Sequence, residues 1–167
     1  MKKFNTYQKN GFTLAAACGL IGITYGVFAD TAGLSLLQAS ALSIFTFTGA
    51  SQFTAVSVID GGGNPAAAVS SALLLSARNA LYGPVITKSL NNGKLKKAVA
   101  AHFVIDETIA IASAQETNKD SRDSFWFTGI CLFVFWNIGT ILGVLLGGIL
   151  EDPGSWGLDA AFPAAFV

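Results

Sequence analysis

Residues 124–150 read SFWFTGICLFVFWNIGTILGVLLGGIL, a stretch of 27 residues without Asp, Glu, Lys or Arg. A helix needs roughly 20 apolar residues to cross the hydrocarbon core of a bilayer, so this stretch is predicted to span a membrane. Gly139, Gly143 and Gly147 recur in it at four-residue spacing, which would let a second helix approach closely. The stretch therefore indicates a membrane-embedded helix bundle.

The rest of the chain has the same character. Of its 167 residues, 52% are hydrophobic and only 12% are charged, whereas soluble domains carry about 25% charged residues. Residues 11–29 and 31–59 also lack charged side chains. The formal net charge is zero, so nothing suggests nucleic-acid binding. We expect an all-α, polytopic transmembrane bundle.

The first span is predicted over Gly11–Phe28. Lys2, Lys3 and Lys9 precede this apolar run, as in a secretory signal peptide. The run continues well past Cys18, the residue at which a lipoprotein signal would be cleaved, which favours an uncleaved transmembrane helix. Lysines flanking a span favour the cytoplasm, so residues 1–10 are predicted to be a cytoplasmic N-terminus and residues 11–167 a single transmembrane domain.

The second apolar segment, Ser35–Ile59, has a polar centre. Residues 46–53 read TFTGASQF, which suits a broken or re-entrant helix lining a cavity better than a helix facing lipid. The basic loop Lys88–Lys97 is also expected in the cytoplasm. An even number of crossings must then separate it from the N-terminus, and a re-entrant Ser35–Ile59 supplies that number.

Arg78 is the first candidate for function, because it lies within the apolar segment Pro65–Thr87. A central Arg costs about 2.5–3.5 kcal/mol on insertion scales, so a partner or a wet cavity must offset it. Asn79 is adjacent and Tyr82 shares its helix face at i+4. The alternative is a structural Arg that binds backbone carbonyls.

Asp106 and Glu107 form a second candidate site, in the apolar segment Ala98–Gln115. Adjacent helical residues diverge by about 100°, so the two carboxylates are expected on different faces. Buried carboxylates are common proton carriers in membrane pumps. The alternative is an interfacial position close to Lys97.

The broken segment supplies a third candidate site. Exposed backbone and hydroxyl groups at Thr48, Gly49, Ser51 and Gln52 suit an amino or carboxylate group of a substrate. The alternative is hydrogen bonding between helices, which Ser and Thr often provide in membranes.

Enzyme signatures are missing from the sequence: it has no Gly-x-Ser-x-Gly, no His-Glu-x-x-His and no phosphate-binding loop. Cys18 and Cys131 both lie in apolar segments without a Cys-x-x-Cys or Cys/His cluster. The sequence therefore predicts no catalytic activity, no cofactor and no metal site.

Five motifs in order resemble the AzlC family, the large subunits of bacterial branched-chain amino-acid exporters. The resemblance runs roughly from Gly22 to Phe166. Its motifs are FTGASQF at residues 47–53, LLLSARNALY at 73–82, Asp106-Glu107, WNIGT at 136–140 with Gly143 and Gly147, and Gly157-Leu158-Asp159 with Phe162-Pro163-Ala164.

The resemblance implies a secondary transporter in the bacterial inner membrane that exports branched-chain or similar amino acids, with possible proton coupling, beside a small AzlD-type membrane subunit. For such a transporter, the candidate residues named above are predicted to bind substrate, at Thr48, Gly49, Ser51, Gln52, Arg78, Asn79 and Tyr82, and to couple protons, at Asp106 or Glu107. Family chains run longer, so the transmembrane domain is expected to be truncated at its C-terminal end. A channel-like pore and a non-transporting scaffold subunit stay open as alternatives.

Overall fold

The computed structural model describes residues 5–87, 90 and 93–149. Within these residues all regular structure is helical, which confirms the predicted fold class. The helices are α1 (Thr6–Thr31), α2 (Leu36–Phe45), α3 (Gly49–Asp60), α4 (Pro65–Ser76), the 3-10 helix η1 (Ala77–Tyr82), α5 (Gly83–Thr87), α6 (Lys94–His102), α7 (Asp106–Ser113) and α8 (Asn118–Gly147).

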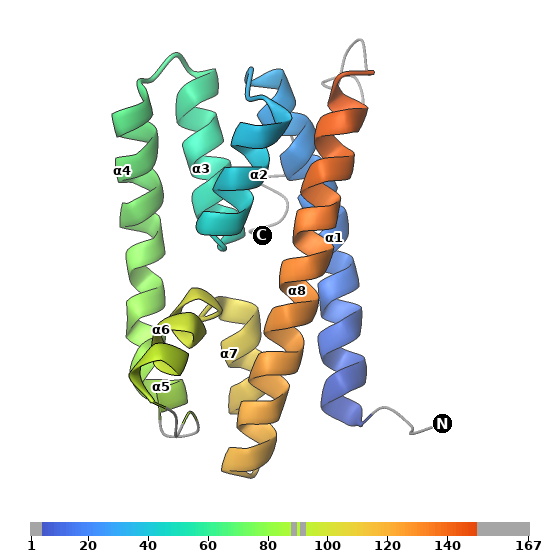
Figure 1. The fold of residues 1–167 in the computed structure, drawn as a ribbon, viewed down its shortest axis with the longest axis vertical. Helices are drawn as coiled ribbons and strands as arrows, with labels where there is room; N and C mark the ends of the chain where they lie inside the picture. Colours follow the sequence, from blue (N-terminus) through green and yellow to red (C-terminus); the bar gives the residue numbers. More distant parts are fainter. Residues whose placement is uncertain (1–4, 88–89, 91–92, 150–167) are drawn as a thin grey trace.

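Two long parallel helices, α1 and α8, form the frame of the bundle and run side by side over its height (Figure 1). Both are long and apolar enough to cross a membrane. A Cβ atom added at Gly22 would lie 2.9 Å from the carbonyl oxygen of Trp136, and Gly26 and Gly143 meet one turn further along. The predicted close packing through glycines is confirmed.

The segment Ser35–Ile59 is broken, as the sequence predicted. Helix α2 ends at Phe45, residues 46–48 leave the helical conformation, and α3 returns towards the end of the bundle from which α2 came (Figure 1). The two half-helices make a hairpin that reaches only partway through the bundle. The helices α4, η1 and α5 then lead to the opposite end of the bundle.

A second hairpin, α6–α7, enters from the other end of the bundle (Figure 1). It interrupts the apolar segment 98–115, for which the sequence predicted no break: the chain leaves the helix at Phe103, and Ile105 is extended with φ −134°. The Thr108 hydroxyl accepts from the Ile105 N–H (3.2 Å) and donates to the Phe103 carbonyl (2.6 Å). These bonds satisfy backbone groups that the break releases.

The tips of the two hairpins meet in the middle of the bundle. The ring of Phe47, in the first break, lies 5.8 Å from the ring of His102 and 5.8 Å from that of Phe103, beside the second break. Phe133 of α8 packs against Phe47 at 5.1 Å. These ring contacts join the two breaks, with His102 stacked on Phe47.

The segment that carries Arg78 also departs from a regular α-helix. Residues 77–82 form the 3-10 helix η1 between α4 and α5. Pro84 follows, and it has no N–H to donate to the Ala80 carbonyl four residues earlier. The Gly83 N–H bonds to that carbonyl instead. A 3-10 stretch within a helix often marks a functional hinge or a strained sequence, and here it carries Arg78.

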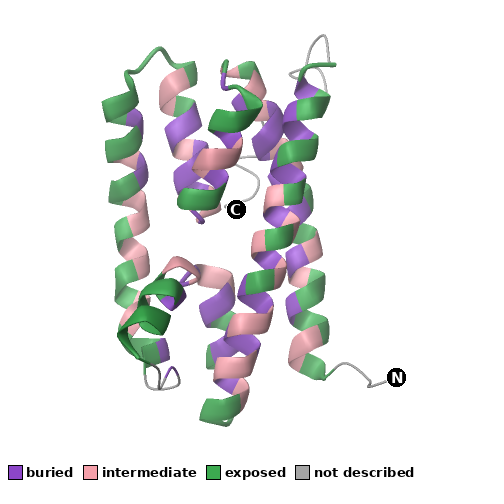
Figure 2. Ribbon diagram, in the orientation of Figure 1, coloured by how far each residue is buried: buried purple, intermediate pink, exposed green. Residues whose placement is uncertain are grey.

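Burial follows the membrane-protein pattern. Figure 2 shows the buried residues where α1, α8 and the hairpins meet, while the outer face of α4 is exposed. That face carries large apolar side chains such as Leu73 and Leu74, which are 66% and 80% exposed. Such a face suits contact with lipid rather than water.

Candidate functional site

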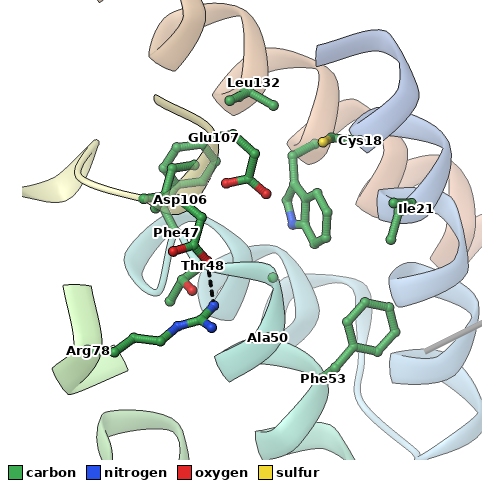
Figure 3. A pocket seen from close by; sticks show the side chains of 13 residues that line it. Cys18, Ile21, Phe47, Thr48, Ala50, Phe53, Arg78, Asp106, Glu107 and Leu132 are labelled. Carbon is green, nitrogen blue, oxygen red and sulfur yellow. Dashed lines mark hydrogen bonds and ion pairs between the residues drawn. The ribbon is translucent and has the colours of Figure 1, made fainter. Parts of the chain in front are cut away.

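A cavity of about 100 Å³ lies where the two hairpin tips meet α1 and α8 (Figure 3). Its polar and charged lining comes from Thr48, Gly49, Arg78, Asp106 and Glu107. Its apolar lining comes from Cys18, Ile21, Phe47, Ala50, Phe53, Ile105, Leu132 and Trp136. Five candidate residues that lie far apart in the sequence are thus brought to one cavity.

Arg78 and Asp106 form an ion pair across this cavity. A guanidinium nitrogen of Arg78 donates to a carboxylate oxygen of Asp106 at 2.7 Å, and the Tyr82 side chain lies near that carboxylate. The two charged side chains are 40% and 42% exposed. Arg78 therefore has the partner that an Arg inside a membrane requires. Tyr82 lies beside the pair but is not among the cavity-lining residues.

Glu107 differs from its neighbour Asp106. Its side chain points into the cavity (Figure 3), and it takes part in neither of the ion pairs found among the described residues, which are Arg78–Asp106 and Arg122–Asp123. The sequence placed the two carboxylates on different helix faces, but Asp106 and Glu107 both line this cavity, and only Asp106 meets Arg78. The cavity therefore holds one paired and one unpaired carboxylate.

The N-terminus of α3 also opens on the cavity, through Thr48, Gly49 and Ala50. Thr48 makes no side-chain cap, and the first turn contains no acidic residue. The start of a helix carries a partial positive charge and free N–H groups. A Cβ at Gly49 would lie 2.8 Å from the indole of Trp136, so a residue without a side chain allows this close approach.

Ser51 and Gln52 do not line the cavity, although they belong to the same motif. Both are fully buried. The Ser51 hydroxyl bonds to Ser76 of α4 at 3.0 Å. The Gln52 amide donates to the Thr46 carbonyl in the break and accepts from the Trp136 indole N–H at 2.8 Å. Their contacts correspond to the alternative of hydrogen bonding between helices.

Asn79 lies outside the cavity lining too, and its buried Oδ1 has no partner in the described structure. The sequence did not single out the apolar wall, to which Cys18, Ile21, Phe53 and Leu132 contribute. Leu132 precedes Trp136 by four residues and Cys18 precedes Ile21 by three, spacings that share one helix face. Trp136, a large aromatic residue in the middle of the uncharged run 124–150, was the signal that could have located that face on α8.

Trp136→Phe is expected to lower the free energy of unfolding by about 1–3 kcal/mol. It leaves the fully buried Gln52 carbonyl oxygen without a donor, and a buried acceptor without a partner costs that amount. Thermal unfolding of the purified protein in detergent measures the loss. Adding Gln52→Met removes the stranded group, so the double variant is expected to lose less than the sum of the single variants. Strict additivity would contradict a Trp136–Gln52 bond.

Comparison with known proteins places the chain among membrane proteins. A branched-chain amino acid transport protein, AzlC, of Bacillus subtilis is 27% identical over 150 residues, covering 88% of this chain and 58% of its own. The inner membrane protein YgaZ of Escherichia coli is 28% identical over 137 residues, covering 78% and 56%. An uncharacterized membrane protein of Archaeoglobus fulgidus is 30% identical over 142 residues, covering 83% and 60%.

The chain thus matches somewhat more than half the length of these relatives. No solved structure matches it significantly. The family described as AzlC protein matches residues 13–150, a range that includes both broken hairpins, Arg78, Asp106 and Glu107. Since this match covers most of the sequence, the chain belongs to the AzlC family.

Proposed function

We propose that this chain is the substrate-binding part of a secondary transporter that exports branched-chain or similar amino acids across the bacterial inner membrane, coupled to protons. The observation that carries the proposal is the cavity between the two opposed hairpins. It combines charged groups of both signs with an apolar wall. An amino acid with an apolar side chain has the same three elements: an ammonium, a carboxylate and a hydrocarbon group.

The substrate carboxylate is assigned to the α3 N-terminus and Arg78. The N–H groups at Gly49 and Ala50 and the guanidinium offer donors to an anion. The hydrocarbon group is assigned to the wall that includes Ile21, Phe53 and Leu132. The relative from Bacillus subtilis is named a branched-chain amino acid transport protein, which agrees with this choice of substrate.

Ser51, Gln52, Asn79 and Tyr82 have supporting roles in this proposal. Gln52 and Ser51 hold the α3 tip against α8 and α4, and Tyr82 lies near Asp106. Broken helices that meet at mid-membrane are the usual substrate sites of secondary transporters. Movement of one hairpin relative to the other would expose the cavity first to one side and then to the other.

An AzlD-type membrane subunit is the proposed partner. The ion pair Arg78–Asp106 is about two-fifths exposed, with side-chain values of 40% and 42%. Charged groups inside a membrane face protein or water rather than lipid. A neighbouring membrane helix beside this pair would provide that cover.

The end of the bundle where α1 begins is proposed to face the cytoplasm. The described cationic residues of that end are Lys9, Lys94, Lys96, Lys97, Lys119 and Arg122, whereas Asp30 and Asp60 lie near the other end. An excess of Lys and Arg marks cytoplasmic loops. Residues 1–10 would then be cytoplasmic, ahead of a single transmembrane domain.

Cysteines introduced at Lys9 and Lys94, with Cys18 and Cys131 replaced by Ala, are expected to resist a membrane-impermeant thiol reagent in whole cells. A cysteine at Asn64, in the loop between α3 and α4, is expected to react, because that loop lies at the opposite end. All three positions are exposed, so accessibility is matched. Different labelling of Lys9→Cys and Lys94→Cys would rule out a re-entrant α2–α3 hairpin.

Exchange of labelled leucine in proteoliposomes tests the transport function. Vesicles that contain the complete transporter and are loaded with unlabelled leucine are expected to accumulate external labelled leucine transiently. Uptake is expected to saturate, to be competed by valine and isoleucine, and to be absent from protein-free vesicles. A channel would equilibrate the label without this transient accumulation, and a scaffold would show no uptake.

A further inference from the structure

We infer that Glu107 binds the ammonium group of the substrate and a proton in alternation, so that a single carboxylate couples the two movements. This inference rests on the proposed transport function and assigns its chemistry to one residue. It separates the roles of two adjacent carboxylates that the sequence could not distinguish.

Asp106 is already committed to Arg78. Its carboxylate accepts from the Arg78 guanidinium at 2.7 Å. Arg78 does not lose its proton under physiological conditions, so the pair is a fixed feature of the cavity. Proton or ammonium binding at Asp106 would have to displace Arg78, whereas binding at Glu107 displaces no residue of an observed ion pair.

Glu107 is placed to receive a cation. Its side chain points into the cavity on the side of the α7 tip (Figure 3). The titratable or charged groups around it are Asp106 on its own helix, Arg78 and Tyr82 of η1, and Cys18 of α1. The α8 wall beside it contributes Leu132 and Trp136, and the α3 tip contributes Thr48 and Gly49, none of which titrates.

The charges in the cavity support the same reading. Arg78 balances Asp106, so an ionised Glu107 leaves one negative charge without compensation. A carboxylate held away from water requires either a positive partner or its own proton. The substrate ammonium is one way to satisfy Glu107 and a proton is the other. One carboxylate cannot hold both as an ion pair, because protonation removes its charge.

Competition between the proton and the substrate ammonium for Glu107 produces an exchange of one proton for one amino acid. When the amino acid leaves on one side of the membrane, Glu107 takes a proton from water on that side. When the next amino acid binds from the other side, the proton passes to water there and the ammonium takes its place. One proton therefore crosses in the direction opposite to each amino acid, without any further group.

Binding experiments on the complete transporter in nanodiscs test the assignment with three probes: leucine, isoamylamine, which lacks the carboxylate, and isocaproate, which lacks the amine. Glu107→Gln is expected to weaken the binding of leucine and of isoamylamine about 10–100-fold, as for loss of a hydrogen bond to a charged group. The affinity for isocaproate is expected to change less than about threefold. Glu116→Gln, at an exposed residue between α7 and α8, is the matched control.

Proton release gives the second measurement. Titration calorimetry in buffers of different ionisation enthalpy is expected to show about one proton released per leucine bound at low pH by the wild type, and none by Glu107→Gln. Leucine affinity of the wild type is expected to fall with falling pH, and that of the variant to stay constant.

The outcomes separate this inference from the transport function. If Glu107→Gln still exchanges leucine saturably and still binds the ligands with an ammonium group as the wild type does, the role of Glu107 is overturned and the transport function stands. Loss of proton release in Asp106→Asn with its retention in Glu107→Gln would also overturn it. If neither leucine nor isoamylamine binds to the wild-type transporter, the inference and the transport function are overturned together.

Discussion

Arg78→Gln is expected to reduce leucine exchange by at least about 10–100-fold, the effect of removing a hydrogen bond to a charged group. Arg78 lines the cavity, donates to Asp106 at 2.7 Å and is the only cation among the described residues that line it. The substitution removes the donor proposed for the substrate carboxylate and strands Asp106. Both consequences act at the centre of the site.

The free energy of unfolding of Arg78→Gln is also expected to fall, by about 1–3 kcal/mol. Breaking a fully buried ion pair costs about 3–5 kcal/mol, and the lower figure reflects the two-fifths exposure of both side chains. Adding Asp106→Asn removes the stranded charge. The double variant is therefore expected to recover thermal stability without recovering exchange.

Arg122→Gln is the matched control for Arg78→Gln. Arg122 is 41% exposed and pairs with Asp123 at 3.2 Å, so residue type, exposure and partner type are alike, but it lies near the start of α8 and away from the cavity. Exposed pairs contribute about 0–1 kcal/mol, so little change is expected. Arg78→Lys keeps the charge and loses the planar donor geometry. Normal exchange by Arg78→Gln would remove Arg78 from the site.

Gly143→Leu is expected to prevent stable folding of the bundle. A Cβ at Gly143 would meet the Ile23 carbonyl oxygen of α1 in hard contact and would lie 2.8 Å from the Gly26 Cα. These are backbone atoms, which cannot turn aside as side chains do. Overpacking costs about 1–3 kcal/mol in ordinary cores, and a Leu between two helix backbones is expected to exceed that range.

Gly148→Leu provides the comparison, five residues further along. A Cβ there has no contact closer than 4.0 Å, so a larger side chain can extend outwards. The yield of monodisperse protein after detergent extraction, and its melting temperature, measure the difference. Comparable yield and melting temperature for the two variants would show that α1 and α8 do not pack through Gly143.

Local composition was enough to predict the membrane fold and the first break. An uncharged run such as residues 124–150 has a large transfer free energy into lipid whatever its neighbours are. The polar centre at residues 46–48 carries its own cost in lipid and so predicts a break. The same cost argument selected Arg78, Asp106 and Glu107, since each charged group in an apolar segment requires a partner.

Only the tertiary structure showed which of these groups meet. The Trp136–Gln52 bond joins residues 84 positions apart, and whether it forms depends on how α3 crosses α8. The second break is stabilised by hydrogen bonds of Thr108 and by ring contacts of Phe47. In the sequence, Thr108 looks like an ordinary helical residue. Which of the two carboxylates, Asp106 or Glu107, pairs with Arg78 depends on where η1 places Arg78. Helix crossings arise from packing over the whole bundle, so no local pattern in the sequence encodes them.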